Sequence, residues 1–392
     1  MDAEMPICLF CPTELDATTK PEHILLNALG GRKTTTRAIC SACNNTFGRT
    51  IDDVLTSQVV VLRNLLQLES GEGKTAPGLR NIQAGEHKIN IKGDGTLEAV
   101  QKPFTIERRE DGKWNVPIRA RSKEHLAKII PHLAKALKIT EENLRAQLGG
   151  AEASMIIQRP GPVHHALGLG GPDAVRSAMK ACLVLWSTLV GNDEVKSAPY
   201  DAARKFVIDG DRQHRVHIDS RQFADIERMK AAYGLLFNLI YVRSDDSGRV
   251  IGHFTLYNAI AWQFTLAESG GTRNAKIALI SNPLDPNHWS DRAAEEFDVP
   301  FVWLNSPDYS DEFVRSKARL DAILQHYFDT NTPKERSRII DECFAELDIA
   351  PGESVPPNKV SELSRLIARR ITHHAFGLPE EQKLSPSKSR HS

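Results

Sequence analysis

Apolar residues recur at helical spacing after the first 50 residues, and the pattern then changes. From Ile51 to Leu68 the spacing predicts one helix, which ends at Ser70-Gly71. Residues 71–121 instead hold short alternating segments separated by Gly-Asp-Gly and Glu-Asp-Gly turns, a pattern typical of a small antiparallel sheet. The predicted strands are residues 88–91, 97–100, 104–108 and 114–120. Two helices are predicted next, at about 123–138 and 140–148.

The second half of the chain is predicted to be a mixed α/β region that ends in helices. A strand is predicted at 155–158, followed by a helix at 173–190 that begins at Pro172-Asp173 and stops at Gly191. Further strands are predicted at 235–242, 250–257, 260–266, 276–280 and 301–304. Residues 309–375 are predicted to be helical with a break at 350–357. The fold class is therefore predicted to be α+β.

These changes of pattern divide the chain into five predicted parts. A compact module with its following helix occupies 1–70, and a region that is first β-rich and then helical occupies 71–150. A mixed α/β domain covers 151–308 and a helical C-terminal part covers 309–377. The tail at 378–392 is rich in Pro, Ser and Lys and is predicted to be disordered.

The charge balance limits how the chain could bind nucleic acid. Lys and Arg number 50, and Asp and Glu also number 50. A protein that coats nucleic acid without specificity is usually basic, so any such footprint has to be local. Residues 71–150 carry 15 basic and 10 acidic side chains. This excess of positive charge could bind the phosphates of a nucleic acid, or it could simply form a solvated face of the sheet. The basic residues that cluster there are Arg108, Arg109, Lys113, Arg119, Arg121 and Lys123.

Nothing in the pattern indicates export or a membrane span. The first residues are acidic rather than basic and apolar, and no apolar run approaches the roughly 20 residues of a membrane helix. Two of the six cysteines, Cys182 and Cys343, lie in apolar helical patterns and are predicted to be buried free thiols. We therefore expect a soluble, cytoplasmic protein in a reducing compartment.

The other four cysteines have the spacing of a structural zinc site. Cys8 and Cys11 form one CxxC pair, and Cys40 and Cys43 form a second. Four thiolates hold Zn²⁺ in a tetrahedron at about 2.3 Å. The loop between the pairs has 28 residues, against roughly 15–20 in a plain zinc ribbon. It therefore holds something besides a metal knuckle.

That loop contains a candidate catalytic pair. Glu22 and His23 are adjacent in an apolar run, and Asn44 directly follows the last cysteine. An imidazole can act as a general base near neutral pH, and the oxygens of Glu22 and Asn44 suit Mg²⁺ or Mn²⁺. Neighbouring residues of a strand face opposite sides, so Glu22 and His23 can aim at one point only if the strand bends or ends there, and we expect that it does. Two alternatives stay open. His23 could have a structural role instead of a catalytic one, and Asn45 could bind the metal in place of Asn44.

The order of these residues resembles that of the HNH, or ββα-metal, endonucleases, in the subtype with two zinc-binding CxxC pairs. The shared pattern is CxxC, Glu-His-Ile, a Leu-Gly-Gly turn and CxxC-Asn, within about residues 6–55. An asparagine stands where the family name has its last histidine. The middle asparagine that usually steadies the loop is missing from residues 31–39. Carried over by position, the zinc ligands would be Cys8, Cys11, Cys40 and Cys43.

The resemblance implies a DNA endonuclease that hydrolyses phosphodiester bonds with structural Zn²⁺ and one catalytic Mg²⁺ or Mn²⁺. His23 would be the general base, and Glu22 and Asn44 would hold the catalytic metal. Candidates to hold flanking phosphates are Arg32, Lys33 and Arg37, for which a solvated loop is the alternative. The alternative function is a zinc-knuckle regulator that binds nucleic acid or protein without catalysis.

Most of the chain lies outside this module and is expected to restrain or direct it. The resemblance implies a bacterial antiviral-defence or restriction-like role, in which an activating ligand or protein partner acts through the C-terminal region. Symmetric cutting of both strands would favour a homodimer. His164 and His165 are either metal ligands or structural residues, and the glycine-rich turn at 168–171 either binds phosphate or only starts a helix.

Overall fold

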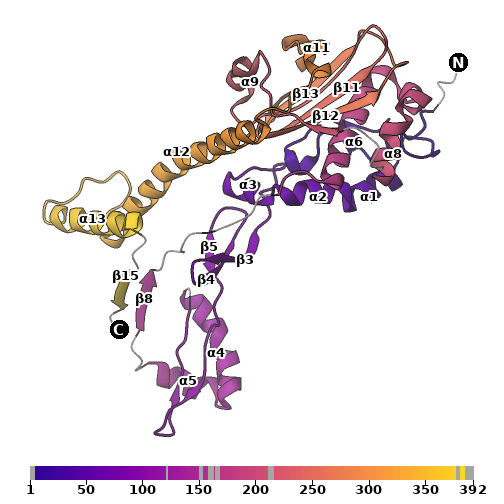
Figure 1. The fold of residues 1–392 in the computed structure, drawn as a ribbon. Helices are drawn as coiled ribbons and strands as arrows, with labels where there is room; N and C mark the ends of the chain where they lie inside the picture. Colours follow the sequence, from indigo (N-terminus) through magenta and orange to yellow (C-terminus); the bar gives the residue numbers. More distant parts are fainter. Residues whose placement is uncertain are drawn as a thin grey trace. The chain divides into compact units, whose positions relative to one another are not determined.

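The computed structural model describes residues 5–120, 122–149, 153–157, 163, 168–210, 216–376 and 380–384. The chain forms two compact units, each made of segments that are distant in sequence. The fold is α+β, as predicted (Figure 1). Unit 1 comprises Met1–Leu79, Lys92–Thr96 and Ala166–Asn331, and unit 2 comprises Arg80–Ile91, Leu97–His165 and Thr332–Ser392.

Unit 1 contains a six-stranded antiparallel sheet with the strand order β14-β13-β10-β11-β12-β9 (Figure 1). Its central strands are buried on both faces, so their sequences are apolar almost throughout rather than alternating. The strands are β9 (Val216–Ile218), β10 (Asn238–Ser244), β11 (Val250–Leu256), β12 (Ile260–Ala267), β13 (Lys276–Asn282) and β14 (Asp285–Ser290).

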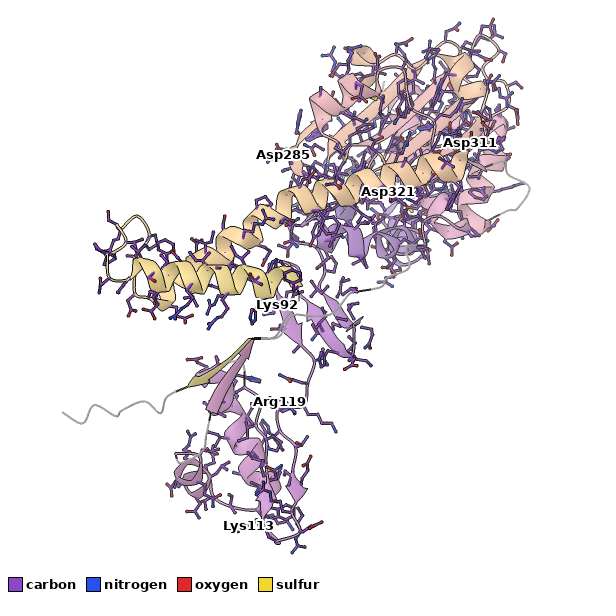
Figure 2. All side chains as sticks on the ribbon, turned by 60° about the vertical axis from the view of Figure 1, so that its left-hand side comes forward. Lys92, Lys113, Arg119, Asp285, Asp311 and Asp321 are labelled. Atoms are coloured by element: carbon purple, nitrogen blue, oxygen red, sulfur yellow. The ribbon has the colours of Figure 1, made fainter. Side chains whose placement is uncertain are left out.

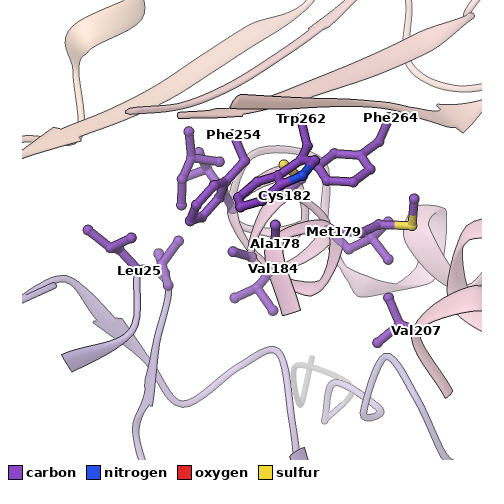
Figure 3. Close-up of a cluster of buried hydrophobic side chains, with 14 of the residues drawn as sticks. Leu25, Ala178, Met179, Cys182, Val184, Val207, Phe254, Trp262 and Phe264 are labelled. Carbon is purple, nitrogen blue, oxygen red and sulfur yellow. The ribbon is translucent and has the colours of Figure 1, made fainter. Parts of the chain in front are cut away.

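Helix α6 (Pro172–Val190) covers one face of this sheet and begins and ends where the sequence predicts. It packs closely because β11 has a glycine beneath it: a Cβ on Gly252 would lie only 3.0 Å from the Cβ of Cys182. Cys182 is buried and free, as predicted. Trp262 and Phe264 of β12 extend over the same helix, and Leu25 from the N-terminal region joins the cluster (Figure 3). One apolar core therefore serves the N-terminal region, α6 and the sheet.

The opposite face of the sheet is covered by α9 (Ile226–Tyr233), α10 (Ala293–Glu296) and α11 (Phe301–Asn305). A strand predicted at 301–304 is wrong, because α11 occupies these residues. Periodicity cannot distinguish a strand from a helix in so short an apolar run. Pro300 favours the start of a helix here, because its missing N–H would have no partner within the helix in any case. Two further helices of unit 1 are α7 (Asn192–Lys196) and α8 (Asp201–Asp209), and a 3₁₀ turn, η2 (Ala198–Tyr200), joins them.

This second face also buries a histidine. His253 of β11 is fully buried, its Nε2 lies 3.1 Å from Thr255 Oγ1, and its Nδ1 lies 3.8 Å from the Asp219 carboxylate. Burial lowers the pKa of His253 to about 4; the charge of Asp219 opposes this, whereas the charges of Arg319 and Arg221 reinforce it. The imidazole is therefore neutral in the folded protein at pH 7.

We expect acid to destabilise unit 1 through this histidine. The folded-state pKa lies below the ordinary value of 6.5, so the unfolded chain binds the extra proton first, and stability present above pH 6.5 is lost as pH falls towards 4. Between pH 7 and pH 5 this amounts to roughly 2 kcal/mol. Denaturant unfolding of His253→Gln at both pH values should show a loss smaller by that amount than in the wild type. An equal loss in the two proteins would contradict the assignment.

The N-terminal part of unit 1 is a short hairpin followed by helices. β1 (Glu22–His23) pairs with β2 (Thr34–Thr35), and a 3₁₀ turn, η1 (Asn27–Leu29), lies between them. Three helices follow the hairpin, and α2 packs against α6 (Figure 1). The single helix predicted at 51–68 is interrupted at Val59, where the backbone leaves helical geometry. The helices are α1 (Ser41–Arg49), α2 (Ile51–Gln58) and α3 (Val60–Leu65).

Unit 2 consists of small sheets and helices. Helices α4 and α5 pack with hairpin residues in a local core around Leu133, and the ends of α12 and α13 form another around Ile339. The strands are β3 (Leu79–Ala84), β4 (His87–Ile91), β5 (Leu97–Ala99), β6 (Glu107–Arg108), β7 (Trp114–Asn115), β8 (Ala153–Ile157) and β15 (Glu380–Leu384). The helices are α4 (Lys123–Leu137), α5 (Glu141–Leu148), α12 (Glu312–Glu346), which starts in unit 1, and α13 (Val360–Phe376).

Several sequence predictions concern unit 2. The strand predicted at 104–108 is reduced to two residues, and Phe104 joins Ile118 only by an isolated bridge. Residues 380–384 of the predicted disordered tail form β15, which pairs with β8. In the basic cluster, Lys113, which directly precedes β7, and Arg119 are exposed; both are labelled in Figure 2.

Some predictions lie outside the described residues: those for His164, His165 and Arg121 and for the end of the tail at 385–392. Within the described part of the chain, none of the helices combines the length and the apolar character needed to span a membrane. Cys343 is buried and free, as predicted.

Candidate active site and cysteine cluster

The four N-terminal cysteines come together as a metal site would require. Cys8 and Cys11 lie in a tight turn closed by a hydrogen bond from Cys8 N to Thr13 O at 2.8 Å, while Cys40 caps the start of α1. The four Sγ atoms lie within 4.8 Å of one another. Four thiolates around Zn²⁺ are about 3.8 Å apart if each bond is about 2.3 Å, so the set fits a tetrahedral zinc site.

Backbone N–H groups point at the sulfurs. Cys40 N donates to Cys8 Sγ at 3.3 Å, and Cys43 N donates to Cys40 Sγ at 3.4 Å. Phe10 N also donates to Cys8 Sγ, at 3.5 Å. A thiolate is the form that binds metal, so this arrangement suits a Zn²⁺ ligand.

Residues distant in sequence hold the cysteine turn in place. Lys196 of α7 donates from Nζ to Cys8 O at 3.0 Å and to Cys11 O at 3.1 Å. Asn192 donates to Ile7 O at 2.7 Å. The cysteine cluster is thus anchored to the same unit that contains the sheet.

The hairpin that follows carries the Glu-His pair and needs a glycine turn. A Cβ on Gly31 would lie 1.8 Å from Leu25 O, so no larger residue fits where the chain passes itself. Asn27 ties this turn to the segment after α3: its O accepts from Gly71 N at 2.8 Å and its Oδ1 accepts from Glu72 N at 3.1 Å. These two hydrogen bonds join the turn after β1 to residues 71 and 72.

β1 consists of Glu22 and His23 alone, with Glu22 buried and His23 half-buried, and the strand ends at His23. Glu22 is buried at 4% exposure, and its Oε1 accepts a hydrogen bond from Lys180 Nζ at 2.7 Å. Lys180 lies on α6 and is itself fully buried. Burial raises the pKa of Glu22, and the charge and hydrogen bond of Lys180 oppose that rise.

Lys180 has a second carboxylate partner. Its Nζ lies 2.6 Å from Oδ2 of Asp52 on α2, and the other oxygen of Asp52 accepts from Ser177 Oγ at 2.6 Å. Burial acts to lower the pKa of Lys180, but the charges and hydrogen bonds of Asp52 and Glu22 together raise it above its usual value. We refer to Glu22, Lys180, Asp52 and Ser177 as the lysine network.

His23 is half-buried, and in the described part of the chain its ring makes no hydrogen bond. Burial lowers the pKa of His23; the charge of Glu72 acts in the opposite direction and that of Lys180 in the same direction. The ring is therefore neutral at pH 7, the form that can accept a proton.

Asn44, on α1, reaches back to the start of β1. Its Nδ2 donates to Pro21 O at 3.4 Å, directly beside Glu22. Asn45 is exposed, and its side chain makes no hydrogen bond among the described residues. Of the two asparagines, Asn44 is therefore the one that contacts the hairpin beside Glu22.

The residues considered for phosphate binding differ in their surroundings. Lys33 forms an ion pair with Asp291 at 2.6 Å, and Arg32 donates to Asn287 of β14. Arg37 is exposed and forms no ion pair within the described ranges. Among the described residues, Arg37 is thus the one of the three whose side chain has neither an ion pair nor a hydrogen bond.

A divalent cation fits the donor atoms that remain available. In the described part of the chain, neither Glu22 Oε2 nor Asn44 Oδ1 takes part in a hydrogen bond. A carboxylate oxygen and an amide oxygen are ligands that Mg²⁺ and Mn²⁺ accept. The residues present are thus compatible with the metal that the resemblance implies.

Sequence reasoning missed Lys180, Asp52 and Ser177. One signal was available: Lys180 lies three residues after Ser177 in the helix predicted at 173–190, and the residues around Lys180, from 178 to 186, are otherwise apolar. A charged side chain in such a helix is seldom fully buried unless it is paired. The pattern could have predicted a buried acidic partner, although not which one.

Comparison with known proteins agrees with this geometry. A family described as HNH endonuclease matches residues 8–60, from the first cysteine through α2. Neither the curated proteins nor the solved structures contain a match to the chain. The matched segment contains all four cysteines, the Glu-His pair and Asn44. Residues 8–60 are therefore an HNH endonuclease domain within a longer chain.

Proposed function

We propose that the protein is a metal-dependent endonuclease that hydrolyses phosphodiester bonds of DNA, with His23 as the general base. The observation that carries this proposal is a half-buried imidazole on β1 of an HNH domain, whose ring makes no hydrogen bond within the described part of the chain. An HNH nuclease domain implies a nucleic-acid substrate. That the substrate is DNA rather than RNA is part of the proposal, and so is the identity of the catalytic metal.

In this proposal each side chain has one task. His23 accepts the proton of the attacking water, which requires the neutral ring. Glu22 and Asn44 would hold Mg²⁺ or Mn²⁺, which supplies charge neutralisation at the phosphate and the departing oxygen. The cysteine cluster would hold Zn²⁺ and keep the start of α1 fixed relative to the hairpin. Arg37 would contact a flanking phosphate.

Cleavage of supercoiled plasmid tests the proposal. We expect nicked or linear DNA with Mg²⁺ or Mn²⁺, no product with EDTA, and 5′-phosphate ends. A 5′-labelled RNA of the same sequence, run in parallel, distinguishes DNA from RNA as substrate. Tight DNA binding without cleavage at any metal concentration would instead support a zinc-knuckle regulator.

A role for the remainder of the chain also belongs to the proposal. The HNH domain shares its core with α6 and the sheet, which supports a nuclease whose activity depends on those residues rather than a separable module. Comparing cleavage with and without candidate activators, such as modified DNA, would test gating. A protein that is fully active without any addition would argue against it.

A further inference from the structure

Lys180 connects the HNH domain to a part of the chain that the family match does not include. Its side chain is 1% exposed and its Nζ lies 2.7 Å from Glu22 and 2.6 Å from Asp52. Glu22 lies within residues 8–60, whereas Lys180 lies on α6, 158 residues later in sequence. A buried ammonium requires such partners, and a buried carboxylate requires a donor.

The contacts constrain both ends of the lysine network. Ser177, one turn before Lys180 on α6, donates to the second oxygen of Asp52, so Asp52 is held by two hydrogen bonds from one helix. Lys180 Nζ also lies 5.8 Å from the centre of the Phe47 ring. With its ammonium placed by Asp52 and Phe47, Lys180 can fix the direction of the Glu22 carboxylate.

Two features indicate that Lys180 orients Glu22 rather than replacing a metal ion on it. Lys180 uses only Oε1 of Glu22, and Oε2 takes part in no hydrogen bond within the described residues. The network also contains two carboxylates and one ammonium, so a negative charge remains when all three are ionised. Residual negative charge favours a cation beside it.

We infer that Lys180 is a positioning residue of the nuclease site: it holds the Glu22 carboxylate so that its second oxygen is presented to the catalytic divalent cation. This inference rests on the proposed function. It makes α6, outside the family match, a necessary part of the site. Hydrogen-bond partners of metal ligands generally matter in this way, and their loss weakens metal affinity by about 10–100-fold.

The test compares Lys180→Met with the wild type in the full-length protein. Mn²⁺ binding is followed by the electron paramagnetic resonance signal of free Mn²⁺, and plasmid nicking is measured over a Mn²⁺ series. We expect Lys180→Met to raise both the Mn²⁺ dissociation constant and the half-saturating Mn²⁺ concentration about tenfold or more. Zinc content should stay unchanged, because the network does not contact the cysteines.

Two variants complete the design. Lys205→Met, at an exposed position of α8, removes the same charge from the same unit and should leave Mn²⁺ binding and nicking unaltered. If Lys180→Met melts below the assay temperature, Lys180→Gln keeps a hydrogen-bond donor without the charge. We expect it to shift the Mn²⁺ requirement in the same direction.

The outcomes are distinct. Unchanged Mn²⁺ binding in a folded Lys180 variant would make the role of Lys180 purely structural and overturn the inference, while the nuclease proposal would stand. Tighter Mn²⁺ binding would overturn it too, because it would mean that the ammonium competes with the metal. A wild-type protein that neither binds Mn²⁺ nor nicks DNA would instead remove the proposed function, and this inference with it.

Discussion

Replacing His23 with alanine should abolish most of the cleavage while leaving the protein folded. A general base typically contributes about 10²–10⁴-fold to the rate, and we expect the nicking rate at saturating Mg²⁺ to fall within that range. The ring is half-buried and makes no hydrogen bond in the described part of the chain, so its removal breaks no network. Single-turnover nicking, zinc content and thermal melting should be measured on the same preparation.

His132→Ala is the matched control for this variant. His132 is exposed on α4 of unit 2 and forms no ion pair or hydrogen bond among the described residues. The His132→Ala variant should cut at the wild-type rate. Equal nicking by His23→Ala would show that another group activates the water. Loss of zinc in that variant would mean that His23 acts on the metal knuckle rather than on the substrate.

The cysteine cluster could be predicted from sequence because its geometry depends on local spacing. Two residues between each pair of cysteines allow both thiols to reach one ion, whatever the rest of the fold does. Helix α6 was equally predictable, since Pro172 and Gly191 mark its ends and an apolar stretch lies between them. Both features are set by neighbours along the chain.

The surroundings of Glu22 could not be predicted in the same way. The sequence requires the strand to bend or end at Glu22-His23 if both are to act together, and β1 ends at His23, but the sequence does not say what lies beneath Glu22. The answer is Lys180, whose partners Glu22 and Asp52 are separated from it by more than 100 residues. Pairing of buried charges over such distances depends on tertiary packing, which periodicity does not contain.

The same reason explains the organisation of the chain. Sequence patterns placed boundaries near residues 70 and 150, where composition changes. The compact units of the structure are divided differently. Residues 1–79 and 166–331 belong to one unit, which packs around α6. Leu25 of the hairpin region and Trp262 of the sheet belong to the same core. A change of composition marks a change of local structure, but it does not show which segments pack together.

Loss of the zinc site should have the largest effect on the fold. We expect Cys40→Ser to lose zinc and all cleavage activity, because the variant removes a thiol of the cluster while serine can still cap the start of α1. Zinc binding contributes on the order of 10 kcal/mol in small zinc modules that fold only with metal. Here the loss should stay local. Although the hairpin shares an apolar core with α6, the sheet is held by its own strand pairing.

Hydrogen exchange would show how far the damage extends. In Cys40→Ser, backbone amides of residues 6–55 should exchange rapidly, while those of β10, β11 and β12 should remain protected. Cys343→Ser, which changes a buried free thiol of unit 2, should keep one zinc per chain and normal cleavage. If Cys40→Ser retains zinc and still cuts DNA, the cluster is not the support of the HNH domain. If the sheet loses protection as well, zinc stabilises the whole of unit 1 and not only the hairpin and α1.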